Sequence, residues 1–164
     1  LDLHSFPTRR SSDLAAEQQR EDAEELARET EQANSVLRAL IDTMPIGVVV
    51  SDTQGAVILA NPAAKAVLGE LAVRPLPGGG EERMLLDRDG RPLSPGDLPL
   101  SRAVARGEVS RGVEILVRGA DGAETAILTA AAPVRDGDGR VISGVAVFQD
   151  LTQQIGRASG RERV

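Results

Sequence analysis

The feature that most constrains this sequence is the stretch from Met44 to Gly69, which predicts strand, turn, strand and helix with no residue left over. Gly47 to Asp52 is apolar and rich in β-branched residues. Asp52-Thr53-Gln54-Gly55 has the composition of a tight turn, with glycine where a positive φ would be needed. Ala56 to Ala60 then resumes the apolar run, so the pattern predicts a β-hairpin.

A short helix is predicted directly after the second strand of this hairpin. The Asn61 side chain can accept hydrogen bonds from the free N–H groups of the first helical turn. Pro62 suits the first helical position, and Gly69 can end the helix in the left-handed conformation. We therefore expect Asn61 to be the helix cap.

The next segment is less regular. Glu70 to Pro95 is rich in Gly, Pro and charged residues, and it predicts a loop with at most one short helix. Asp97 to Arg106 predicts a helix that ends before Gly107.

Three further strands are predicted after this helix. In residues 113–118, apolar residues at 113, 115 and 117 alternate with Glu114, Leu116 and Arg118, a cleaner alternation than in the later strands, which places that strand nearer an edge of a sheet. Residues 126–132 and 141–148 carry apolar residues on both faces, which favours central positions. The last strand runs into Asp150-Leu151-Thr152, where Asp150 can cap a following helix and Gln153 can complete a capping box.

The two ends of this region resemble the start and the end of a PAS sensory domain. The hairpin that leads into an Asn-Pro-Ala-Ala helix start matches the beginning of such domains, and the Asp-Leu-Thr ending matches their carboxyl-terminal signature. The resemblance covers roughly residues 40–154. The positions that carry it are Pro45, Gly47, Asp52, Gly55, Asn61, Asp150, Leu151 and Thr152.

This resemblance implies an α+β PAS fold with a five-stranded antiparallel sheet of order 2-1-5-4-3, helices on one face and a small internal cavity. Strand alternation then predicts which side chains share the cavity face. The expected pocket residues are Val48, Val50, Ile58, Leu100, Val104, Ile115, Val117, Leu128, Val145 and Val147. The cofactor stays unknown. Haem-binding members use a His and photoreactive flavin members use a Cys, whereas this chain has no Cys and a single His.

A polar helix without Gly or Pro is predicted over residues 15–43, ahead of the PAS region at 44–152. Apolar or small residues recur along it at alternating spacings of three and four, as in a coiled coil. The expected dimer seam consists of Ala23, Leu26, Thr30, Ala33, Leu37, Leu40 and Met44. A single solvated helix is the alternative, because Ala and Thr weaken the start of the seam.

The sequences of both termini resemble translated sequencing adapter rather than natural protein. Residues 4–14 match one reading frame of a common sequencing adapter, and residues 155–164 resemble the translation of its reverse complement. We expect residues 1–14 to be disordered and residues 153–164 to hold the start of an output helix followed by adapter sequence. His4, the only His of the chain, lies in the first of these segments.

Composition and motifs restrict the function classes. The formal charge is −6 and no basic run is interleaved with aromatic residues, which argues against a nucleic-acid partner. No catalytic constellation or metal-ligand cluster is present in the sequence, and no apolar run is long enough to span a bilayer. The sequence predicts a non-enzymatic cytoplasmic module.

Two functions remain for such a module. The first is a sensory and signal-relay PAS domain that binds a small ligand or partner and acts through its flanking helices. The resemblance implies a homodimer in a two-component sensor histidine kinase. The alternative is a ligand-free structural dimerisation module of a diguanylate cyclase, a phosphatase or a transcription regulator.

Overall fold

The computed structural model describes residues 8–72 and 83–152, and the chain divides into two units, Leu1–Ile41 and Asp42–Val164. The first unit consists of helix α1, Thr8–Thr43, whose last two residues belong to the second unit. The helix includes residues 8–14, for which the sequence predicts disorder. No Gly or Pro follows Pro7 in this segment, so nothing in its sequence stops the helix from continuing.

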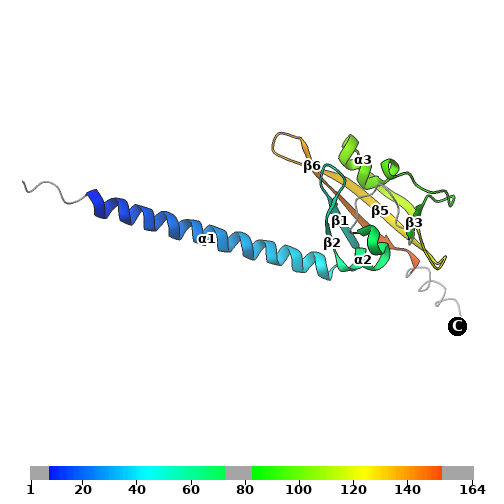
Figure 1. The fold of residues 1–164 in the computed structure, drawn as a ribbon, viewed down its shortest axis with the longest axis horizontal. Helices are drawn as coiled ribbons and strands as arrows, with labels where there is room; N and C mark the ends of the chain where they lie inside the picture. Colours follow the sequence, from blue (N-terminus) through cyan, green and yellow to red (C-terminus); the bar gives the residue numbers. More distant parts are fainter. Residues whose placement is uncertain (1–7, 73–82, 153–164) are drawn as a thin grey trace, which may run out of the picture. The chain divides into compact units, whose positions relative to one another are not determined.

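The second unit is built on one antiparallel sheet of six strands in the order β2-β1-β6-β5-β4-β3 (Figure 1). The strands are β1 Gly47–Ser51, β2 Val57–Ala60, β3 Arg83–Leu86, β4 Ser110–Gly119, β5 Glu124–Arg135 and β6 Val141–Asp150. The last strand, β6, lies between β1 and β5. The two ends of the domain therefore meet in the middle of the sheet.

The prediction of five strands is wrong by one. The five expected strands have the expected order, but β3 adds a sixth at the edge beyond β4. Strand β3 has only four residues and lies in the segment that the sequence predicts to be a loop. Its pairing with β4 places Leu85 opposite Val117. Such a short strand is defined by its partner rather than by its own periodicity.

Helix α2, Pro62–Leu68, is fixed to the sheet by the side chain of Asn61. Its Oδ1 accepts hydrogen bonds of 2.9 Å from the N–H groups of Ala64 and Val48, and its Nδ2 donates to the carbonyl oxygen of Ile46. Asn61 is fully buried. The predicted cap therefore also joins the helix to the start of β1.

Helix α3, Pro99–Arg106, covers strands β5 and β6 on the same face of the sheet as α2. It starts two residues later than predicted, because Asp97 belongs to the short 3₁₀ turn η2, Pro95–Asp97. It ends at Gly107, which has the left-handed φ of 66° expected of a glycine cap. A second 3₁₀ turn, η1 Gly69–Ala72, follows α2.

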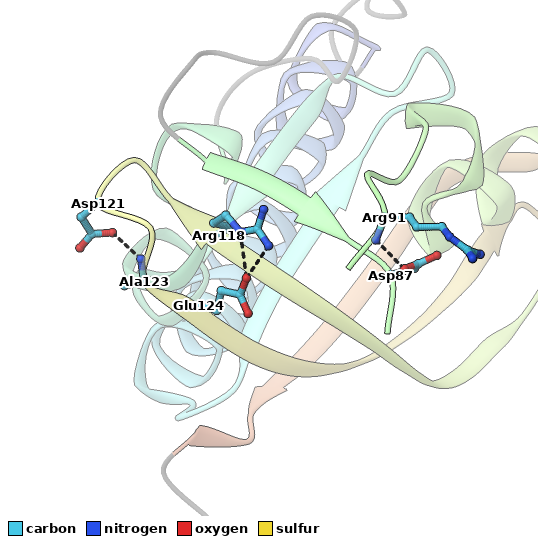
Figure 2. A network of polar contacts seen from close by, with 6 residues as sticks. All are labelled: Asp87, Arg91, Arg118, Asp121, Ala123 and Glu124. Atoms are coloured by element: carbon cyan, nitrogen blue, oxygen red, sulfur yellow. Dashed lines mark hydrogen bonds and ion pairs between the residues drawn. The ribbon is translucent and has the colours of Figure 1, made fainter. Parts of the chain in front are cut away.

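Aspartate side chains shape four turns of the second unit. The Oδ1 atoms of Asp52, Asp87 and Asp136 each accept hydrogen bonds from the N–H groups two and four residues later. In the β4–β5 turn, Asp121 accepts from Ala123, while Arg118 and Glu124 form an ion pair across the hairpin (Figure 2). Turn formation thus accounts for these carboxylates.

Candidate functional site: an apolar cavity under the helices

A cavity of about 70 Å³ lies between the covered face of the sheet and the segments that contain α2 and α3, and it is partly open to solvent. Every strand except β2 contributes at least one side chain from its interior, and Val57 at the start of β2 contributes as well. The lining residues are Val49, Val57, Leu68, Leu71, Leu85, Leu98, Pro99, Leu100, Ile115, Ile127, Thr129, Ala146 and Phe148. No charged side chain belongs to this described lining.

Thr129 supplies the only side-chain hydroxyl group of this lining. The residue is 5% exposed, and its Oγ1 has no hydrogen-bond partner among the described residues. It lies on β5 opposite Phe148 of β6 and Val113 of β4. One buried polar atom therefore belongs to an otherwise apolar wall.

The Phe148 side chain occupies a distinctive place in the wall. Phe148 pairs with Gly47 in the β1–β6 ladder, and a Cβ atom added to Gly47 would collide with the phenyl ring. The ring therefore packs directly over the backbone of the first residue of β1. It also lines the cavity and is 5% exposed.

The predicted pocket residues match this lining only at Leu100 and Ile115. On β1 and β6 the face assignment was displaced by one residue, because Val49, Ala146 and Phe148 line the cavity. Their neighbours Val48, Val50, Val145 and Val147 lie on the opposite face, where they pair with one another. When a strand has apolar residues on both faces, the alternation of its side chains does not show which face lines the cavity.

The other predicted pocket residues also take places outside the cavity. Ile58, at the β1–β2 bulge, is 63% exposed, and Leu128 faces the outer side of β5. Val117 belongs to the buried core but does not line the cavity. Val104 of α3 packs over Gly144, where an added Cβ would lie 2.6 Å from its Cγ2.

Several lining residues were missed by sequence reasoning. Leu71 and Leu85 come from a segment predicted as loop, and Leu68 from the end of α2, where no periodicity assigns a face. Leu98 belongs to the apolar side of the predicted helix 97–106 but was not included among the pocket residues. Phe148 carried a usable signal, since the chain has only two Phe and no Trp or Tyr. A single large aromatic residue within an apolar strand is a strong candidate for the centre of a hydrophobic core.

The Asp150-Leu151-Thr152 motif forms the exit from the sheet. Asp150 is the last residue of β6, and its Oδ1 accepts a 2.8 Å hydrogen bond from the N–H of Thr152. The N–H of Leu151 donates to the carbonyl oxygen of Ala126 at a distance of 2.8 Å. Residues 153–164, with the expected output helix and Gln153, lie outside the described residues.

The expected dimer seam lies on α1 except for Met44, which follows the last helical residue, Thr43. Leu26, Leu37 and Leu40 are more than half exposed in the single chain. Thr30 bonds back to the carbonyl oxygen of Leu26, as hydroxyl residues often do within helices. A coiled-coil pairing of this seam stays a prediction.

The described residues form neither a metal-ligand cluster nor a membrane-spanning helix. Within residues 8–72 and 83–152, no group of three or more His, Cys, Asp or Glu side chains could hold a metal ion. In the same part of the chain, no helix combines the length and the apolar character needed to cross a membrane.

The sheet order, the covering helices and the partly open cavity define an α+β module, and a family model identifies the class. The model described as "PAS fold" matches residues 41–156, which is more than half of the chain, so this chain belongs to the PAS fold family. This result confirms the family expected from the sequence. No curated protein sequence matches the chain significantly.

Solved structures agree with this fold. The PAS domain of BvgS from Bordetella pertussis is 17% identical, with a TM-score of 0.55 over 84% of this chain and 99% of that one. The PAS domain of an HTR-like protein from Haloarcula marismortui is 16% identical, with a TM-score of 0.51 over 77% and 98%. The E. coli DhaR(N)-DhaL complex gives 20% identity and a TM-score of 0.51 over 77% of this chain and 39% of that chain.

Proposed function

We propose that the second unit is a sensory and signal-relay module whose cavity binds a small molecule and whose flanking segments transmit the change. One observation carries the proposal. The cavity is lined by β1, the strand that follows α1, and by β6, the strand that leads into Asp150-Leu151-Thr152. A molecule in the cavity therefore touches both strands through which the domain connects to the rest of the protein.

Phe148 is the residue we assign to the relay. Its ring separates the cavity from the backbone of Gly47, which lies four positions after the last residue of α1. It also lies two positions before Asp150 on β6. Displacement of the ring by a ligand would loosen or tighten its packing contact with Gly47 and thereby shift β1 relative to β6. A packed interior responds to such shifts in discrete steps, which suits a two-state signal.

The full chain can test this proposal directly. We would titrate it with p-cresol as a probe, follow the methyl resonances of Val49, Leu100 and Ile115, and measure hydrogen exchange over residues 41–52 and 145–152. We expect the cavity methyl signals to shift and the exchange rates at both strand ends to change together. Val147 and Leu128, on the outer face, are the internal controls. Unshifted cavity methyl signals at millimolar probe would contradict ligand binding.

The proposed context is a homodimer in a cytoplasmic two-component sensor histidine kinase, as the PAS resemblance implies. The α1 seam is the proposed contact between copies, because its leucines are exposed in the single chain. With Ala and Thr at several positions the pairing buries little apolar area, so it is marginal and can be shifted by its neighbours.

The dimer has a matched test on the full chain. Replacing Leu37 and Leu40 by Glu places charges in the seam, whereas replacing Ser35 and Ala39 by Glu adds the same charge outside it. At about tens of micromolar protein, we expect light scattering to give a dimer mass for the wild type and the control pair and a monomer mass for the seam pair. A seam variant that stays dimeric would show that the contact is elsewhere.

A structural dimerisation module is the second candidate, and the small size of the cavity favours it. A volume of about 70 Å³ is roughly half of the approximately 150 Å³ cavity that accepts benzene in an engineered protein. In that case the probe leaves the cavity methyl signals unchanged while the seam variant still dissociates the dimer.

A further inference from the structure

The cavity wall contains one buried polar atom without a partner. Thr129 is 5% exposed, lines the cavity and lies in the middle of β5 with β4 and β6 on either side. Its Oγ1 makes no hydrogen bond to any described residue. An unpaired buried hydroxyl lowers stability, and Val has nearly the same shape without that cost. Thr129 lines the cavity, so a rotation of its side chain about χ1 would present this hydroxyl to a molecule there.

The rest of the wall restricts the partner of this hydroxyl. All other lining side chains are apolar, and none of the described lining residues is charged. An ion in this wall would lose its hydration without a counter-charge, which is strongly unfavourable. The volume of about 70 Å³ holds only part of a small molecule, and the open side allows the rest of a ring or short chain to extend toward solvent.

We propose that Thr129 determines the specificity of the cavity, and that the ligand is a small uncharged molecule with an apolar body and one hydroxyl or carbonyl group. This inference rests on the proposed ligand-binding function. The group that bonds Thr129 brings the ligand beside Phe148, since these two residues are directly opposite on β5 and β6. Recognition and the proposed relay residue are therefore neighbours on adjacent strands.

The experiment compares two probes that differ by one hydroxyl, p-cresol and toluene, on the full chain. Dissociation constants come from the shifts of the Leu100 and Ile115 methyl resonances. A net hydrogen bond within a protein site corresponds to a preference of about 2-fold to 12-fold. We expect the wild type to bind p-cresol more tightly than toluene by that factor, and Thr129→Val to lose this preference or to favour toluene.

Two further variants separate the hydroxyl from packing. Thr129→Ser keeps the hydroxyl and should keep the preference for p-cresol. Ser51→Ala is the matched control, because Ser51 Oγ is also buried without a hydrogen-bond partner among the described residues but lies outside the described lining. Ser51 is opposite Gly144, close to α3. We expect Ser51→Ala to keep the wild-type preference.

The outcomes distinguish this inference from the proposed function. Binding of both probes with the same preference in wild type and Thr129→Val overturns the role of Thr129 and leaves ligand binding intact. Absence of binding by either probe at millimolar concentration overturns both. Loss of the preference in Ser51→Ala would show that any buried hydroxyl acts through general packing, which also overturns the assignment to Thr129. A Thr129→Val spectrum with wild-type dispersion establishes that the variant is folded.

Discussion

The two faces of strand β6 are both apolar, but they differ in the size of their side chains near α3. The face under the helices carries Gly144 and Ala146, with the large ring of Phe148 over Gly47 of β1. The outer face carries Val145 and Val147, which pair with Val50 and Val48 of β1.

Close packing explains this difference. Helix α3 approaches the sheet so closely that a Cβ on Gly144 would lie 2.6 Å from Val104 Cγ2 and 3.0 Å from Leu100 Cδ1. The Phe148 ring likewise requires that residue 47 have no side chain, because a Cβ on Gly47 would collide with it. Small residues on alternate positions of β6 therefore indicate its covered face, whereas β5 has alanine on both faces at residues 130–132. On the outer face the branched side chains of Val48 and Val147 pair across β1 and β6, and Val48 is only 6% exposed.

The largest expected effect is the loss of the ring at the centre of the covered face. Phe148→Ala removes a buried aromatic side chain, which typically costs about 3–5 kcal/mol. We expect about 3 kcal/mol, because the existing cavity lets neighbours relax. Val147→Ala, its neighbour on the outer face, should cost about 1 kcal/mol. Urea unfolding can be followed by the sheet methyl resonances, since the chain has no Trp or Tyr. Equal losses would contradict the difference between the faces.

The next effect tests the small residues themselves. Gly144→Val forces two methyl groups against Val104 and Leu100 and should destabilise the domain by about 2–3 kcal/mol through overpacking. Ser143→Val, one residue earlier and on the outer face, should stay within about 0.5 kcal/mol of the wild type. The same urea experiment measures both. A Gly144→Val protein as stable as Ser143→Val would mean that α3 can move away from the sheet without cost.

These comparisons show how much the sequence could predict. The hairpin, the Asn61 cap, the five expected strands and their order followed from turn residues, periodicity and the PAS resemblance. Strand β3 could not be predicted, since four residues in a Gly- and Pro-rich segment acquire their structure from pairing with β4. The cavity face was assigned wrongly on β1, β5 and β6, because period-two alternation does not identify the covered face when the residues on both faces are apolar.

Steric information would have corrected the face assignment. Gly144 and Ala146 alternate with Val145 and Val147, and Ala131 pairs with Ala146 across the ladder. A row of small residues across neighbouring strands marks the place where a helix packs. Thr129 on the same face was a further indication, because its side chain belongs to the set that contains Ile127 and Ala131.

A smaller effect of opposite sign is expected at Thr129. Thr129→Val removes a buried hydroxyl that has no partner among the described residues, and it should stabilise the ligand-free protein by about 1 kcal/mol. The gain is at the lower end of the range for such groups, since the partly open cavity can admit water. Thr125→Val, a half-buried position nearer the end of β5, should change stability by less than about 0.5 kcal/mol. Destabilisation by Thr129→Val would show that the hydroxyl is paired in solution.

The smallest effect is expected at Leu128, and it tests whether the outer face is free. Leu128 is 37% exposed in the single chain, next to the fully different environment of Ile127, which is 3% exposed. Leu128→Ser removes only part of the apolar area of a fully buried leucine, so we expect a loss of at most about 1 kcal/mol that does not depend on protein concentration. A partner copy covering this face would make the loss larger and would add a concentration dependence, because dimer stability follows mass action. Urea unfolding at about 10 and 200 µM separates the two cases, and Leu37→Glu combined with Leu40→Glu provides the reference in which the α1 seam is absent. If the loss at Leu128 exceeds the expected value only when the seam is intact, the outer face and α1 contribute to one interface. A constant small loss in both backgrounds leaves α1 as the only proposed contact between copies.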